Sequence, residues 1–210
     1  HYLLMFAILG ALILRGLAPE MYEQREDETW QTWWGRAFVV GSVAAPFFLG
    51  MFAANWLLGA TTIVTLPGIV VGLAVVMLTV VDGVAYLRLK TRGDLRDSLR
   101  TDGYLALAAY LVLVVLTLAY IYLAAPFLRP ALFSPLVLAF VLATLVFAAG
   151  YVMGLAYDRD YLTFGATAGM VFGLVGAVAS LMYPHIDRAA GLTVDLAVVS
   201  TLPLNITSIG

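Results

Sequence analysis

Apolar residues gather in six long runs along the chain, separated by short polar segments. Each run is close to the length of about 20 residues that a helix needs to cross a bilayer. The runs are apolar right round and lack the two-residue alternation of a membrane barrel, which favours helices over strands. The six runs cover residues 2–18, 37–58, 67–89, 103–125, 135–157 and 161–183.

Prolines mark several of the expected helix ends. Pro67 and the Ser134-Pro135 pair suit helix starts, because the first turn has no use for the N–H that proline lacks. Pro126 stands where the fourth run ends, and we expect it to stop that helix.

The composition supports a membrane protein. Apolar residues make up 63% of the 210 residues and charged residues only 11%. A soluble domain of this size has too little polar surface to cover so much apolar surface. A net charge of -2 and the absence of cysteine argue against disorder, a nucleic-acid partner and a disulfide scaffold. We therefore predict an all-α, multi-pass transmembrane helix bundle.

Basic residues predict the orientation, because they concentrate on the cytoplasmic side of membrane proteins. With the first helix running inward, the 19–36 loop and the basic 90–102 loop face the cytoplasm, and the opposite side carries Arg129 and Arg188. The acidic residues of the 19–36 loop are expected to be solvated surface. The inward-facing basic residues are Arg15, Arg25, Arg36, Arg88, Lys90, Arg92, Arg96, Arg100 and Arg159.

The two ends of the sequence suggest a portion of a larger subunit. The chain starts at His1 inside an apolar run, and residues 196–210 resemble the start of a seventh span. Segment 2–18 has no basic n-region and no small-residue cleavage site, so it is not expected to be a signal peptide. We expect residues 1–210 to form a single transmembrane domain.

The sequence offers few side chains that could ligate haem or a metal ion. The chain has no cysteine, and its histidines are His1 and His185. A b-type haem pair needs several helix-borne His or Met ligands, and no metal-ligand spacing is present. His185 follows the sixth run, where it is either an interfacial residue or a contact to a cofactor or proton exit. We expect no catalytic centre and no metal site in this chain itself.

Charged residues within the membrane are costly and often functional. Asp82 lies about 10 Å from the end of the third helix at 1.5 Å per residue, and Tyr86 is one turn away. Asp82 is either a carboxylate on a proton or water path from the cytoplasm, or a packing residue paired with a basic group. Arg15 either reaches the headgroups or pairs with Glu20 or Asp82. Asp82, Glu20 and Arg15 are the proton-path candidates.

Small residues at four-residue spacing predict close helix packing. Such residues form a groove that lets another backbone approach, either within this chain or in a partner. Asn55, near the outer end of the second run, is expected to make an interhelical hydrogen bond. The glycines of these grooves are Gly165, Gly169 and Gly173 on the sixth helix and Gly150 and Gly154 on the fifth.

The polar positions, taken in order, resemble subunit II of cytochrome bd-type quinol oxidases. The Leu14-Arg15-Gly16 passage followed by Glu20 is similar to an Arg-Gly passage of that family. Three longer passages match its later motifs. These are Trp34, Gly41-Ser42, Pro46, Gly50, Asn55, Leu57 and Gly59; Gly83, Tyr86-Leu87, Lys90-Thr91, Gly93 and Leu95; and Tyr183-Pro184, Leu192-Thr193, Ala197, Ser200, Leu202 and Asn205.

The resemblance implies a haem-free structural subunit of a prokaryotic plasma-membrane complex that oxidises quinol and reduces oxygen to water. It implies subunit I as the partner that carries haem b and haem d, a small single-helix subunit, and a structural quinone in some members. The family's first two helices and its last helix are not matched. Asp82 stands where family members usually have His or Gln, so the resemblance assigns it no role.

A second hypothesis is a secondary transporter or another multi-pass membrane scaffold. The membrane-embedded Asp82 and Arg15 and the glycine-spaced helices motivate it. Transporters usually carry internal repeats and broken helices near mid-membrane, and the sequence has no convincing repeat. Binding of a substrate by the isolated chain would favour this alternative.

Overall fold

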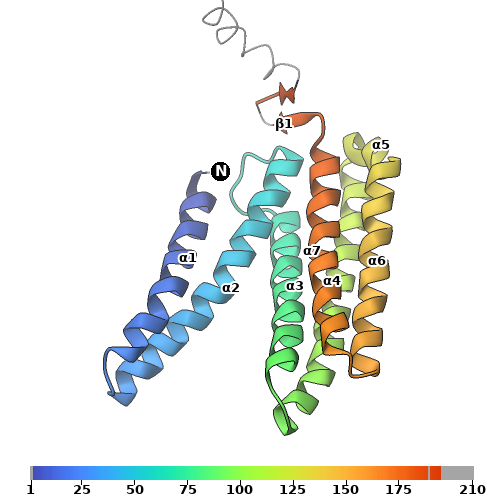
Figure 1. The fold of residues 1–210 in the computed structure, drawn as a ribbon. Coiled ribbons are helices and arrows are strands. Elements are labelled where there is room, and N and C mark those ends of the chain that lie inside the picture. Colours follow the sequence, from blue (N-terminus) through green and yellow to red (C-terminus); the bar gives the residue numbers. More distant parts are fainter. Residues whose placement is uncertain (1, 189, 195–210) are drawn as a thin grey trace, which may run out of the picture.

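The computed structural model describes residues 2–188 and 190–194, and it confirms the all-α bundle with six helices long and apolar enough to span a membrane (Figure 1). The predicted start of a seventh span at 196–210 lies outside the described residues. The six helices are α1 (Tyr2–Glu23), α2 (Glu28–Leu58), α3 (Leu66–Lys90), α4 (Asp94–Ala124), α6 (Pro135–Ala156) and α7 (Asp160–Met182).

The proline signals are confirmed at all three helix ends. Pro67 lies in the first turn of α3, where the side chain of Thr65 caps the helix by accepting a hydrogen bond from the Gly68 N–H. Ser134 caps α6 in the same way, with Pro135 in the first turn. α4 ends at Ala124, two residues before Pro126.

The two predicted cytoplasmic loops are much shorter than expected. α1 continues to Glu23 and α2 begins at Glu28, so most of the 19–36 segment is helical. Most of the 90–102 segment is likewise the first turns of α4, which begins at Asp94. The apolar run marks only the part of a helix that contacts lipid. The helix itself can extend beyond that run, because acidic residues and a capping side chain stabilise its polar first turn. Asp27 caps α2 in this way by accepting a hydrogen bond from the Trp30 N–H.

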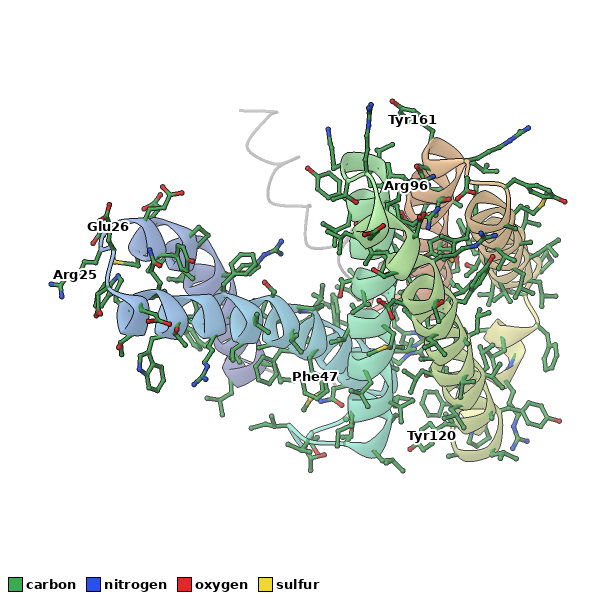
Figure 2. The ribbon with its side chains drawn as sticks, turned by 90° about the horizontal axis from the view of Figure 1, so that it is seen from below. Arg25, Glu26, Phe47, Arg96, Tyr120 and Tyr161 are labelled. Carbon is green, nitrogen blue, oxygen red and sulfur yellow. The ribbon has the colours of Figure 1, made fainter. Side chains whose placement is uncertain are left out.

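The helices form two parts joined along one helix. The α1–α2 hairpin stands to one side and meets the rest through α2, which packs along α3 (Figures 1 and 2). α3, α4, α6 and α7 make a four-helix unit, in which the α3–α4 hairpin meets the α6–α7 hairpin chiefly through α3 and α7. The end that carries the α1–α2, α3–α4 and α6–α7 turns is called the inner end below; the basic residues predict that it faces the cytoplasm.

Glycines form the helix crossings in the first part of the chain. A Cβ added at Gly41 would lie 2.9 Å from the Ala11 carbonyl oxygen and from the Arg15 backbone nitrogen of α1. At the α2–α3 crossing, a Cβ at Gly50 would lie 2.8 Å from the Cα of Gly72. Only glycine permits such backbone approach, which is the main route to tight packing between helices in lipid.

The predicted glycine groove lies within this chain, between α6 and α7, but its members differ. A Cβ at Gly169 would collide with the Phe147 ring, and one at Gly173 with the Thr144 hydroxyl. Gly154 fits against Thr163 in the same tight way. Gly165 and Gly150 do not share this role. A Cβ at Gly165 would meet nothing within 4 Å, and one at Gly150 would make only an ordinary contact of 3.7 Å with Ala166.

Asn55 stabilises the connection that follows its own helix. Its side-chain amide donates to the Ile63 carbonyl at 2.7 Å, and its carbonyl oxygen accepts from the Thr65 hydroxyl. The expected hydrogen bond between two helices is therefore replaced by bonds to the α2–α3 connection and to the residue that caps α3. A polar side chain near a helix end satisfies free backbone groups there more readily than it finds a distant helix.

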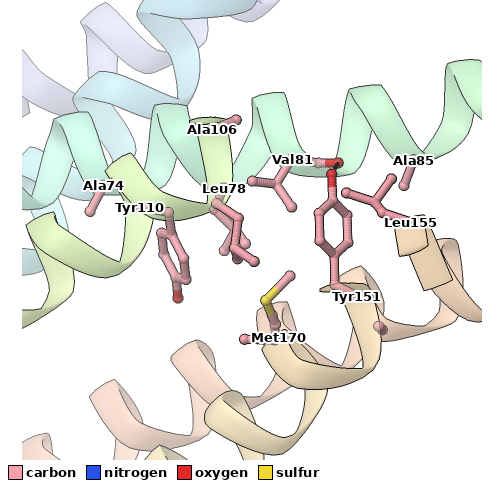
Figure 3. Packing of buried hydrophobic residues seen from close by; sticks show 12 residues of the cluster. Ala74, Leu78, Val81, Ala85, Ala106, Tyr110, Tyr151, Leu155 and Met170 are labelled. Atoms are coloured by element: carbon pink, nitrogen blue, oxygen red, sulfur yellow. Dashed lines mark hydrogen bonds between the residues drawn. The ribbon is translucent and has the colours of Figure 1, made fainter. Parts of the chain in front are cut away.

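The core of the four-helix unit is an apolar cluster in which α3, α4, α6 and α7 meet (Figure 3). Leu78 and Val81 of α3, Tyr110 of α4, Tyr151 of α6 and Met170 of α7 are all buried in it. At the outer end, three short elements follow the helices: η1 (Pro126–Leu128), α5 (Arg129–Leu132) and a two-stranded antiparallel sheet of β1 (His185–Asp187) and β2 (Leu192–Thr193).

Candidate functional site

Asp82 bridges α3 and α7 within the spanning part of the bundle. It is half-buried, and one carboxylate oxygen accepts a hydrogen bond of 2.6 Å from the Thr167 hydroxyl of α7. Thr167 itself is fully buried. Tyr86, the neighbour that helical spacing suggests, instead packs its ring near Phe164 at 6.3 Å. Asp82 is therefore held by a hydroxyl from a facing helix.

The Thr167 hydroxyl can serve both protonation states of Asp82. Its oxygen lies 2.6 Å from the Asp82 carboxylate and 2.7 Å from the Phe164 carbonyl, yet it has one proton to donate. When Asp82 is ionised, that proton points to the carboxylate. When Asp82 is protonated, the carboxyl donates to the threonine oxygen, which then donates to the Phe164 carbonyl. The carboxyl group therefore has a hydrogen-bond partner in either state.

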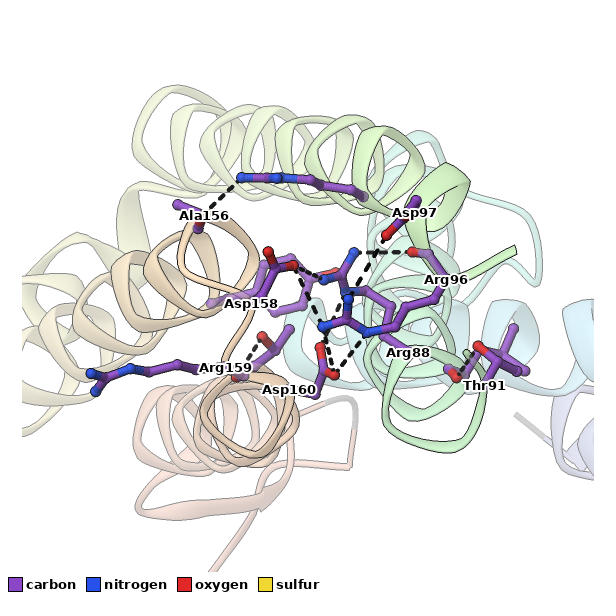
Figure 4. A network of polar contacts seen from close by, with 12 residues as sticks. Arg88, Thr91, Arg96, Asp97, Ala156, Asp158, Arg159 and Asp160 are labelled. Atoms are coloured by element: carbon purple, nitrogen blue, oxygen red, sulfur yellow. Dashed lines mark hydrogen bonds and ion pairs between the residues drawn. The ribbon is translucent and has the colours of Figure 1, made fainter. Parts of the chain in front are cut away.

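A cluster of four charged residues closes the inner end of the same helices (Figure 4). Arg88 of α3 is fully buried, and its guanidinium lies 2.9 Å from Asp158 and 3.4 Å from Asp160. Arg96 of α4 contacts Asp160 at 2.9 Å and Asp158 at 3.5 Å, and its carbonyl accepts a hydrogen bond from Arg88. Two arginines from the α3–α4 hairpin therefore hold two carboxylates of the α6–α7 turn.

The backbone of the α6–α7 turn presents both carboxylates to the arginines. Asp158 has a φ of 54°, in the left-handed region that aspartate tolerates better than most residues. The Arg159 N–H returns to the Gly154 carbonyl at 2.8 Å, and Arg100 donates to the Ala156 carbonyl at 2.9 Å. An open cavity of about 640 Å³ lies beside the cluster. Its lining combines charged residues, among them Arg88, Arg96 and Asp160, with Leu89 and Leu162.

The outer half of the same seam is apolar and less tightly closed. A cavity of about 250 Å³ lies there, with side chains from α2, α3, α4, α6 and α7 around it. Tyr110 lines it, and the Tyr110 side chain is fully buried with no hydrogen-bond partner for its hydroxyl among the described residues. A buried hydroxyl without a partner costs about 1–3 kcal/mol. The walls of the cavity are formed almost entirely by apolar atoms, and the Tyr110 hydroxyl is buried behind them without a partner among the described residues.

Comparison with known proteins gives one family. The family model of cytochrome bd terminal oxidase subunit II matches residues 1–210. The chain belongs to this family. A search of curated proteins gave no match. Membership makes the chain a membrane subunit of a terminal quinol oxidase complex, and it favours the oxidase hypothesis over the secondary transporter.

In this subunit II, the other two proton-path candidates lie away from Asp82. Arg15 and Glu20 are exposed residues of α1, on the far side of α2 from α3 (Figure 1). Within the part of the chain that the structure describes, no ion pair joins Arg15 to Glu20 or Asp82. Of the two alternatives for Arg15, the exposed position on α1 agrees with a side chain that reaches the headgroups, and the pairing has no counterpart among the described residues.

Metal-ligating side chains are scattered in this subunit II. Among residues 2–188 and 190–194, no group of three or more His, Cys, Asp or Glu side chains could hold a metal ion. His185 lies on β1 at the outer end, half-buried, and its Nδ1 has no hydrogen-bond partner there.

Sequence reasoning missed most of the inner cluster. It counted Arg88 and Arg96 only as markers of orientation and gave Asp158 and Asp160 no role. A signal was present, because Arg88 lies within the last turns of an apolar run and an arginine there must find a partner. Thr167 and Tyr110 carried no such signal, since threonine and tyrosine are common in membrane helices.

Proposed function

We propose that this chain is a haem-free structural subunit of an oxidase complex that oxidises quinol and reduces oxygen to water. In this proposal subunit I carries haem b and haem d, and the present chain supports it in the membrane. The observation that carries the proposal is the family match over residues 1–210, and the shortage of histidine and the absence of cysteine support the haem-free role. A small single-helix subunit is the other proposed partner.

Deletion and purification test this proposal. A strain without the gene is expected to lose quinol-dependent oxygen uptake by this oxidase, and the complex purified from the wild type is expected to contain a larger haem-bearing chain. Unchanged oxygen uptake in the deletion strain, measured with other oxidases absent, would contradict the proposal. A haem spectrum from this chain purified alone would contradict its haem-free role.

We further propose that Asp82 takes part in a proton path from the inner end. The support is its place in the spanning part of the bundle, its Thr167 partner that can serve both protonation states, and the open cavity beside the charged cluster at the inner end of the same helix. A proton arriving from the inner side would protonate the carboxylate and reverse the direction of the Asp82–Thr167 hydrogen bond. Its departure would restore the first arrangement.

The Asp82→Asn variant tests the proton path in the whole complex. Asparagine keeps the size and can still accept from Thr167, but it cannot take up a proton. Proton uptake coupled to turnover in liposomes is expected to fall severalfold, with a changed pH dependence of oxygen consumption. The control is Asp97→Asn, an aspartate whose side chain is 76% exposed at the inner end. Unchanged uptake and pH dependence in Asp82→Asn would leave Asp82 as a packing residue.

We also propose that the outer cavity is the place for a structural quinone. The fit rests on the lining: a quinone needs apolar walls for its isoprenoid tail and a donor for a carbonyl oxygen. Tyr110 lines an apolar cavity of about 250 Å³, and its buried hydroxyl has no partner among the described residues. A quinone there supplies a bound redox-active ring. Tyr110 would hold the ring by one hydrogen bond, while the surrounding apolar side chains would exclude water.

The amount of quinone that copurifies with the complex tests this proposal directly. Tyr110→Phe is expected to lower the amount of quinone that copurifies with the complex after detergent washing. The matched control is Tyr122→Phe on the same helix, because Tyr122 is 49% exposed and does not line the cavity. Equal quinone content in the two variants would remove Tyr110 from any quinone site.

The proposed location is the prokaryotic plasma membrane, with the inner end in the cytoplasm. The chain has no cysteine, so single cysteines report the side on which a residue lies. A cysteine at Ser98, exposed near the start of α4, is expected to react only with reagents that reach the cytoplasm. One at Thr61, exposed in the α2–α3 connection, is expected to react from outside. The reverse labelling pattern would contradict the orientation.

A further inference from the structure

Two polar links join α3 to α7 at matched depths. Arg88 meets Asp160 at the inner end, and Asp82 meets Thr167 deeper in the bundle. Arg88 and Asp82 are six residues apart on α3, or about 9 Å along the axis at 1.5 Å per residue. Asp160 and Thr167 are seven residues apart on α7, or about 10 Å. Since the two helices run in opposite directions, these spacings match, and the two links are successive contacts along the same α3–α7 interface.

The link at the inner end belongs to a cluster with several polar contacts, whereas the deeper link has few. Arg88 is fully buried and donates a hydrogen bond of 2.9 Å to Asp158. It lies 3.4 Å from Asp160 as an ion pair without a hydrogen bond, and Arg96 donates two hydrogen bonds to Asp160. The deeper link is a single hydrogen bond from the Thr167 hydroxyl to one carboxylate oxygen of Asp82. Along the rest of the seam the packing is apolar, and apolar contact gives helices in lipid little preference for one register. The charged cluster is therefore the element that fixes how far α7 has slid along α3.

We propose that Arg88 and Asp160 are positioning residues for Asp82: they fix the register of α7 against α3 and thereby hold the Thr167 hydroxyl on the Asp82 carboxylate. A slip of one helical turn moves a side chain by about 5.4 Å, which breaks a hydrogen bond of 2.6 Å. This inference deepens the proposed proton path, on which its functional meaning rests. Titratable groups around this seam include Tyr86 of α3, whose ring packs near Phe164, Tyr151 of α6, which lies near both Asp82 and Arg88, and Tyr104 of α4.

Infrared difference spectroscopy of the purified complex tests the positioning role. The carboxyl band of Asp82 in pH-induced spectra is identified as the band that Asp82→Asn removes. Thr167→Val is expected to shift this band to higher frequency, because the carboxyl loses its hydrogen bond. Asp160→Asn is expected to shift it in the same direction, although Asp160 lies about 10 Å away along α7.

The double variant separates positioning from a direct electrostatic effect. If Asp160 acts through Thr167, then Asp160→Asn combined with Thr167→Val gives the same band position as Thr167→Val alone. Shifts that add, or an unshifted band in Asp160→Asn, would overturn the proposal. The control is Asp97→Asn. Asp97 also lies near Arg96, at 3.8 Å, but it belongs to α4 and not to α7, so its loss is expected to leave the band in place.

Asp158→Asn gives a second route if Asp160→Asn prevents assembly. Asparagine tolerates the left-handed backbone of this position, so the turn is kept while one carboxylate of the cluster loses its charge. The expected result is a shift in the same direction, and Asp158→Asn combined with Thr167→Val is expected to give the same band position as Thr167→Val alone. These spectra do not depend on proton transport. A failure of Asp82→Asn to change proton uptake would end the proton path alone, and a failure of the band shifts would end the positioning role alone.

Discussion

The seam between the α3–α4 and α6–α7 hairpins has two halves of opposite character. In its inner half, two arginines hold two aspartates, and Asp82 meets Thr167. In its outer half there is a cavity of about 250 Å³ with apolar walls, and the buried Tyr110 hydroxyl has no partner among the described residues. The same four helices are thus joined by polar contacts at one end and separated by a cavity at the other.

This difference follows from the physics of helices in lipid. Lipid tails are as apolar as leucine, so apolar contact alone does not drive helices together. Close association comes from small residues and from polar groups that find each other. The inner half of the seam has the charged cluster and the Asp82–Thr167 hydrogen bond. The lining of the outer cavity has no charged side chain, and its Thr117 and Thr144 hydroxyls bond carbonyls of their own helices rather than a facing helix. The outer half is therefore the part that can hold a lipid-soluble molecule without breaking the bundle.

The largest expected effect is the loss of Arg88. Arg88→Leu leaves Asp160 with Arg96 alone and Asp158, whose side chain is 53% exposed, partly to water. Loss of a hydrogen bond between charged groups costs about 1.5–3 kcal/mol. We expect that loss in the unfolding free energy, measured by denaturant titration in mixed micelles. Lys90→Leu is the control, because Lys90 is an exposed cation in the last turn of the same helix. Equal stability in the two variants would show that the inner half is no more strongly joined than the outer half.

A smaller effect is expected from a change inside the α6–α7 hairpin. Gly169→Leu places a side chain on the Phe147 ring, and overpacking of this kind costs about 1–3 kcal/mol. We expect a lower yield of assembled complex, measured by size-exclusion chromatography. Gly165→Leu is the matched control, since a Cβ there meets nothing within 4 Å. Normal assembly of Gly169→Leu would mean that hairpin packing does not limit the seam.

The sequence predicted the helices well and their contacts poorly. Runs of apolar residues report lipid contact, so they located all six spans, but they could not show that α4 already begins at Asp94, nine residues before its apolar run. The glycine spacing found the α6–α7 contact. It could not separate its members, because four residues advance about 40° beyond a full turn, and Gly165 therefore faces about 80° away from Gly173. Arg88 and Asp158 are 70 residues apart, and no local pattern connects them.

The finest test compares two tyrosines that differ mainly in which half of the seam they occupy. Tyr151 and Tyr110 are both fully buried, but the Tyr151 hydroxyl donates to the Val81 carbonyl at 3.4 Å, whereas the Tyr110 hydroxyl has no partner in the described part of the chain. Tyr151→Phe removes a long hydrogen bond, and we expect a loss of about 0.5–1 kcal/mol. Tyr110→Phe removes an unsatisfied group of the same shape, so we expect no loss, or a gain of about 1 kcal/mol, in protein stripped of lipid-soluble ligand.

The sign of the Tyr110→Phe effect depends on what fills the cavity, which makes the pair informative. Unfolding titrations of both variants, before and after addition of quinone, separate the contributions. Added quinone is expected to stabilise the wild type and Tyr151→Phe, and to stabilise Tyr110→Phe less, because a ligand that binds the folded state adds stability in proportion to its affinity. If Tyr110→Phe instead loses as much as Tyr151→Phe without any ligand, the Tyr110 hydroxyl already has a partner, and the contrast between the two halves of the seam is smaller than the geometry indicates.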